Sequence, residues 1–119
     1  MTDLEAMKLC AEAMSETINE HNGYLFFYGP QYSSQQRNQH YDPLHDDAQA
    51  MALVKRFKLD LEPLFVGEEG EWQACQWRED GNGRIHKKND TDLNRAIVLC
   101  VAGMAANGKL PQRRAQEGK

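Results

Sequence analysis

The feature that most constrains the fold is an almost continuous apolar segment, residues 93–106. Its apolar side chains recur at the three- and four-residue steps of one helix face, with little polar face left by Val98, Leu99 and Ala102. We therefore expect a helix that is covered on more than one side. Asp90 or Thr91 is the expected cap, and Asn107-Gly108 the expected end. The apolar face comprises Leu93, Ala96, Ile97, Cys100, Val101 and Met104.

Composition predicts one globular domain over residues 1–110, followed by a polar, disordered tail over residues 111–119. Of the 119 residues, 40% are hydrophobic and 27% charged, which suits a folded domain. The net charge of -4 argues against a general nucleic-acid-binding protein but allows a local basic patch. The longest apolar run is too short to span a bilayer, and no secretory signal opens the chain. We therefore expect a cytoplasmic protein without membrane contact.

The cysteines form an odd set without a C-x-x-C pair: Cys10, Cys75 and Cys100. Each lies beside apolar residues, which favours reduced, partly buried thiols. A nucleophilic cysteine is the alternative, but none has a histidine or a helix start beside it in sequence.

Two further helices are expected. Thr2 and Glu5 form a capping box, and an apolar stripe from Leu4 to Ile18 predicts a first helix that ends at Asn22-Gly23. For the second helix, Pro43 disfavours an earlier start, Asp46 or Asp42 can cap the amides, and Asp47 suits the positive end of the helix dipole. Its predicted apolar face is Ala50, Met51, Val54 and Phe57.

Between the helices, the pattern predicts strands. Residues 24–28 are aromatic and end at Gly29-Pro30, so they are expected to form a short strand or a buried extended segment. Residues 31–40 are a polar loop. Apolar residues alternate with polar ones over residues 59–65, a strand that Pro63 confines to an edge or a bend. Residues 72–77 and 84–88 supply further strands, joined by turns at 67–71 and 79–83, so the pairing is expected to be antiparallel.

A family resemblance enters through residues 41–50 and 92–97. The stretches Tyr41-Asp42-Pro43-Leu44, Asp46-Asp47-Ala48-Gln49-Ala50 and Asp92-Leu93-Asn94-Arg95-Ala96-Ile97 resemble the small phage and prophage proteins that carry the phage ABA-sandwich domain. The resemblance covers roughly residues 40–105. It implies an α+β, three-layer α-β-α sandwich and a phage or prophage origin. It carries over no catalytic residues, because most members of that group are of unknown function.

His40, His45, Asp46 and Asp47 are the chief candidates for chemistry. Two histidines and two carboxylates around a proline turn could converge on a metal or on a hydrolytic site. The chain has no H-x-x-x-H or H-E-x-x-H spacing, so solvent-exposed residues at a helix start are the favoured interpretation. We expect neither a metal nor a cofactor.

Arg95 and the aromatic residues raise a separate question. Arg95 could hold an anion at a helix start, although pairing with Asp92 or with a carboxylate of residues 42–47 is favoured. Trp77 beside Arg78 could stack on a base or ribose, but aromatic residues in a hairpin are more often part of a core. Arg84, Lys87 and Lys88 are interpreted as a solvated hairpin tip.

These features favour a small non-enzymatic protein that acts by binding. The partner would be a host or phage protein, or a small nucleotide-like ligand, and inhibition of a host defence factor fits a phage origin. A homo-oligomer is compatible with the pattern. The alternative is a small hydrolase-like enzyme that uses His40, His45, Asp46 and Asp47. The residues expected to contact the ligand or partner are Tyr41, Asp42, Asp46, Asp47, Asn94, Arg95 and Trp77.

Overall fold

The computed structural model describes residues 1–33, 39–64, 70–77 and 84–108, with the backbone alone at 77 and 84–87. The elements, in chain order, are α1 (Asp3–Ala13), β1 (Ile18–His21), β2 (Tyr24–Phe27), α2 (Asp47–Phe57), β3 (Asp60–Leu64), β4 (Glu71–Trp77), β5 (Arg84–Asp90) and α3 (Leu93–Ala106). The predicted tail, most of the turns at 67–71 and 79–83, and the Trp77 side chain lie outside the described residues and side chains.

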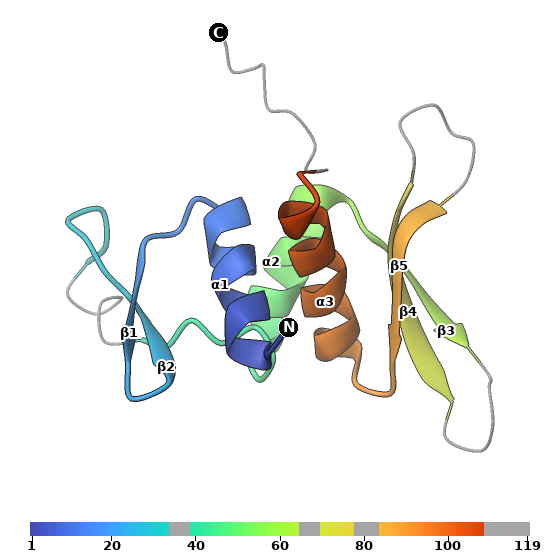
Figure 1. The fold of residues 1–119 in the computed structure, drawn as a ribbon, viewed down its shortest axis with the longest axis horizontal. Helices are drawn as coiled ribbons and strands as arrows, with labels where there is room; N and C mark the ends of the chain where they lie inside the picture. Colours follow the sequence, from blue (N-terminus) through green and yellow to red (C-terminus); the bar gives the residue numbers. More distant parts are fainter. Residues whose placement is uncertain (34–38, 65–69, 78–83, 109–119) are drawn as a thin grey trace, which may run out of the picture.

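The strands form two antiparallel sheets, with strand orders β1-β2 and β3-β4-β5 (Figure 1). The predicted α+β class is confirmed. The helices lie between the two sheets, whereas the expected sandwich has its sheet in the middle layer (Figure 1). The cause lies in α3, which packs against α1 and α2 and also against β4 and β5. A helix that is apolar on nearly all sides must be packed against other elements on more than one side. Within the described residues, the helices are all too short or too polar to cross a membrane.

The first helix is shorter than predicted. α1 ends at Ala13, and Ile18, expected on its apolar stripe, lies on β1 and packs against the core from there. Asn22 and Gly23, with φ of 54° and 80°, form the turn between β1 and β2. Asn-Gly is a preferred hairpin turn because both positions need positive φ. The capping box is confirmed, and the Thr2 amide, which donates to the Glu5 carboxylate, lowers the pKa of Glu5.

Residues 39–41, partly within the predicted loop, add a short third segment to the β1–β2 sheet. The Phe27 amide donates to the Gln39 carbonyl at 3.3 Å, and the Tyr41 amide donates to the Leu25 carbonyl at 2.8 Å. Phe26 and His40 are bridge partners. The backbone that leads toward α2 is therefore held against β2.

The second sheet follows the predicted antiparallel hairpins. β3 lies at the edge, where Pro63 is tolerated because its missing amide leaves no gap in the ladder. β4 is the central strand of this sheet. Its pairing with β5 has a shift in register between Ala74 and Gln76. Ala74 and Cys75 are both buried.

The helix faces agree with the predicted faces except at a few positions. On α2, Ala50 and Phe57 are buried as predicted, but Met51 is 41% exposed and Leu53 is buried in its place. Leu53 lies three residues from Ala50, and Met51 is turned about 100° away, because a helix has 3.6 residues per turn. The cap of α3 is Asp92, since Asp90 still belongs to β5. The predicted cover on more than one side is confirmed by the buried residues Ala96, Ile97, Val98, Cys100, Val101, Ala102 and Met104.

The three cysteines are buried thiols, as expected. Burial raises the pKa of the Cys10 thiol and of the Cys100 thiol to about 12. The pKa of a cysteine thiol in an unfolded chain is about 8.5, so the folded protein holds the two thiol protons more tightly than the unfolded chain does. The stability that follows from this difference is fully present below about pH 8.5 and is lost as the pH rises toward the folded pKa.

We therefore expect the folded protein to resist thiol reagents and to lose stability in alkali. Labelling by 5,5′-dithiobis(2-nitrobenzoate) should be slow in the native protein and rapid in denaturant, since only the thiolate reacts. Urea midpoints should fall as the pH is raised above about 8.5. Rapid stoichiometric labelling of the native protein would contradict the burial of these thiols.

Candidate functional site

The segment before α2 is held by a turn and by the Gln49 side chain. The Asp42 carbonyl accepts from the amides of His45 and Asp46 at 3.0 and 2.9 Å. The Gln49 side chain donates to the His40 carbonyl at 2.9 Å and accepts from the Asp42 amide at 2.6 Å. Gln49 thus fixes the backbone on both sides of Tyr41. The sequence pattern did not single it out, because a glutamine in the first turn of a helix is ordinary.

The side chains of His40, His45, Asp46 and Asp47 do not converge. His45 Nδ1 lies 2.9 Å from a carboxylate oxygen of Asp42, and Asp46 caps α2 by accepting from the Gln49 amide at 3.1 Å. Asp47 accepts from Asn94, and His40 packs on aromatic rings of the hairpin. Across the described residues, we find no group of three potential metal-ligating side chains in one place. The carboxylates at the start of α2 thus have separate structural partners.

We expect Asp46→Ala to lower the free energy of unfolding by about 1 kcal/mol, because the Gln49 amide loses its cap. Glu12→Ala, which removes an exposed carboxylate that caps no helix, should change it by less than about 0.5 kcal/mol. Urea denaturation of both variants measures the difference. Equal effects of the two substitutions would count against the capping role.

Asn94, one of the predicted contact residues, links the starts of α2 and α3. Its side-chain amide donates to Asp47 at 2.9 Å and to the Leu44 carbonyl at 3.4 Å. Of the predicted contact residues, Asp47 and Asn94 therefore lie together. Their hydrogen bond links α2 to α3, so these side chains already have a structural role.

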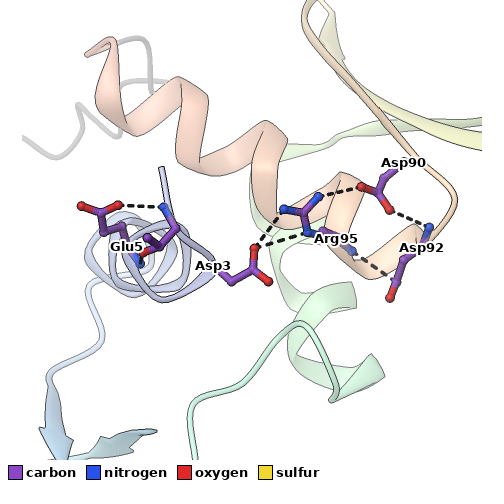
Figure 2. A network of polar contacts seen from close by, with 6 residues as sticks. Asp3, Glu5, Asp90, Asp92 and Arg95 are labelled. Atoms are coloured by element: carbon purple, nitrogen blue, oxygen red, sulfur yellow. Dashed lines mark hydrogen bonds and ion pairs between the residues drawn. The ribbon is translucent and has the colours of Figure 1, made fainter. Parts of the chain in front are cut away.

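Arg95 has partners other than those expected. Figure 2 shows its guanidinium between Asp3 of α1 and Asp90 of β5, with nitrogen–oxygen distances of 3.0 and 2.8 Å. The guanidinium pairs neither with a carboxylate of residues 42–47 nor with Asp92, whose side chain instead caps α3 by accepting from the backbone amides of Asn94 and Arg95. Its bonds to Asp90 and Asp3 raise the pKa of Arg95 still further. Arg95 thus links α1, α3 and β5.

We expect Arg95→Gln to lower the melting temperature, because it removes the link from α3 to both α1 and β5. Arg95→Lys should fall between this variant and wild type, since lysine keeps the charge but cannot reach two carboxylates with a planar fork. The difference in melting temperature between Arg95→Gln and wild type should shrink as salt is added, because the ion pairs of Arg95 are partly exposed. A melting temperature for Arg95→Gln equal to that of wild type at low salt would contradict this role.

Tyr41 was predicted to contact a partner, but the structure buries it. The residue is 4% exposed and its ring packs edge-on against Phe27. Its hydroxyl has no hydrogen-bond partner among the described residues. Burial raises its pKa well above the ordinary tyrosine value. Tyr41 is therefore a core residue. The side chain of Trp77, the other aromatic residue predicted to contact a partner, lies outside the described side chains.

The β1–β2 sheet carries an exposed aromatic surface that the sequence interpretation missed. Side chains alternate along a strand, so Leu25 and Phe27 face the core while Tyr24, Phe26 and Tyr28 face outward. Tyr24 is 58% exposed and Tyr28 60%. The period-two spacing of aromatic residues after Asn22-Gly23 is the pattern that could have revealed it.

His40 completes this surface from the adjoining segment. Its ring centroid lies 4.5 Å from that of Phe26, nearly perpendicular, and 5.2 Å from that of Tyr24. Asn19 and His21 of β1 pair with Phe26 and Tyr24 and share their side of the sheet. We call this surface the hairpin face; it comprises Asn19, His21, Tyr24, Phe26, Tyr28 and His40.

The opposite side of the hairpin has a different character. Glu20 there forms an ion pair with Lys8 of α1, and Ile18 packs against the core. A groove of about 500 Å³ runs between α1 and the hairpin. It is lined by Lys8, Glu12, Glu16, Thr17, Ile18, Glu20 and Leu25. The carboxylates of this region therefore lie on the groove side and not on the hairpin face.

Comparisons of the chain with protein-family models, with curated proteins and with solved structures found no match.

Proposed function

We propose that this chain is a small non-enzymatic protein that acts by binding, and that the hairpin face is its contact surface. The observation that carries the proposal is the joint exposure of Tyr24 and Tyr28 beside Phe26 and His40. Exposed aromatic rings that gather on one side of a small sheet gain free energy when a partner covers them. Tyrosine is also among the residues that contribute most to binding interfaces.

The organisation of the rest of the molecule supports this choice over the surface at the helix starts. Asp46 caps α2, and Asp47, Asn94 and Arg95 are engaged in bonds that join α1, α2 and α3. A ligand at these residues would have to compete with bonds inside the protein. The hairpin face is free of this cost, since its rings contact one another and leave their outer sides open.

The resemblance to phage ABA-sandwich proteins supplies a biological setting for the proposal. In that setting the chain is a phage or prophage accessory protein in the host cytoplasm, and its binding inhibits a host defence factor. Inhibition follows either from contact with a host protein or from capture of a nucleotide-like ligand. The hydrolase-like alternative would need at least two of His40, His45, Asp46 and Asp47 in one pocket, and each of these side chains has a separate partner.

The test is capture of partners from a bacterial lysate, followed by mass spectrometry of the bound proteins and small molecules. Wild type is compared with a Tyr24→Ala, Tyr28→Ala double variant and with Met51→Ala, which removes an exposed apolar side chain from α2. We expect the double variant to lose what wild type and Met51→Ala retain. A bound species that survives the double variant but is lost in Asp47→Ala or Asn94→Ala would place the contact at the helix starts and refute the proposal.

A further inference from the structure

We infer that the hairpin face binds a nucleotide by stacking the base on Tyr24, with His40 beside it. This inference rests on the proposed function and names the class of ligand. The exposed Tyr24 ring supplies a flat surface of the kind on which nucleobases stack, largely independently of base identity. The centroid of the His40 ring lies 5.2 Å from that of Tyr24 and 4.5 Å from that of Phe26, so the three rings form one cluster.

The described residues of the hairpin face include no carboxylate that would repel an anionic ligand. Among the described residues of this face, the ionisable groups are the imidazoles of His21 and His40 and the phenols of Tyr24 and Tyr28. The nearby carboxylates, Glu16 and Glu20, line the groove on the other side of the hairpin. Within the described part of this face, a phosphate beside a stacked base would therefore meet imidazole and amide donors and no carboxylate.

The polar groups of β1 complete the arrangement. Asn19 is paired with Phe26 and His21 with Tyr24, so an amide and an imidazole flank the aromatic row on the same side of the sheet. Both residues are exposed. Such groups can hydrogen-bond to a ribose hydroxyl or to a base edge, whereas an aliphatic protein-docking surface would not need them.

The experiment uses adenosine 5′-monophosphate, uridine 5′-monophosphate and ribose 5-phosphate as probes of the full chain. Resonances of the aromatic and imidazole rings are followed by NMR during each titration. We expect both nucleotides to shift the signals of Tyr24 and His40, and ribose 5-phosphate, which has a phosphate but no base to stack, to shift the Tyr24 signals far less. Tyr24→Ala should weaken the binding of both nucleotides by about tenfold or more, as loss of a stacking ring predicts.

Two further variants keep the test specific. Tyr24→Phe retains the ring and should bind nucleotides nearly as well as wild type, and Met51→Ala should leave affinity unchanged. Ring signals that stay unshifted at millimolar nucleotide would overturn the inference, and so would binding that does not depend on the Tyr24 ring. If a captured protein still depends on Tyr24 and Tyr28 in that case, the proposed function stands and the nucleotide assignment falls.

Discussion

Replacing Val101 with aspartate is expected to unfold the domain. Val101 is fully buried in α3, the helix that contacts α1, α2, β4 and β5. Within this apolar core a carboxylate would be desolvated without a partner, which costs roughly 4 kcal/mol or more. Small domains are stable by only about 5–15 kcal/mol, so this loss removes much or all of the folded population. Ile97→Asp should have a similar effect, because Ile97 is 1% exposed on the same helix.

Far-UV circular dichroism and thermal melting measure this effect. The matched control is Met51→Asp, which introduces the same carboxylate at an exposed apolar position of α2 and should leave the fold intact. A soluble Val101→Asp variant that melts at the wild-type temperature would contradict the central place of α3.

Tyr41→Phe is expected to stabilise the protein, by about 1–3 kcal/mol. The Tyr41 hydroxyl is buried without a hydrogen-bond partner among the described residues, so folding removes it from water without compensation. Phenylalanine keeps the ring against Phe27 and deletes the group that carries this cost.

Tyr32→Phe is the matched control, and we expect it to change the free energy of unfolding in the opposite direction. Tyr32 also packs against Phe27, but its hydroxyl donates to the Glu16 carboxylate at 2.6 Å and accepts from the Thr17 amide at 3.0 Å. Removing the Tyr32 hydroxyl should lower the free energy of unfolding by about 1–2 kcal/mol. Chemical denaturation of both variants is the measurement. A Tyr41→Phe variant less stable than wild type would mean that this hydroxyl has a partner in solution.

Local chemistry in the sequence determined the elements whose ends are set by short-range bonds. Thr2 and Glu5 specify the start of α1, and Asp46 specifies that of α2, because a capping side chain bonds to amides only three residues away. Pro63 could be assigned to an edge strand for an equally local reason, its missing amide.

The boundary between α1 and β1 shows where local patterns become ambiguous. Asn22-Gly23 ends a helix as readily as it turns a hairpin, because both uses need positive φ. The apolar positions up to Ile18 fit a helical period, yet Ile18 reaches the core from a strand. The aromatic alternation of Tyr24 and Phe26 favoured the hairpin, and with it the exposed hairpin face.

Tertiary structure alone decided which distant residues meet. Arg95 pairs with Asp3, at the other end of the chain, because α1 and α3 pack side by side with their first turns together (Figures 1 and 2). Tyr41 was predicted to contact a partner, but it is a core residue because residues 39–41 pair with β2. Helical and strand periods report which side of an element is apolar. These periods do not report which other element covers the apolar side. The packing of α3 against α1, α2, β4 and β5 decides this, and it places the helices between the two sheets.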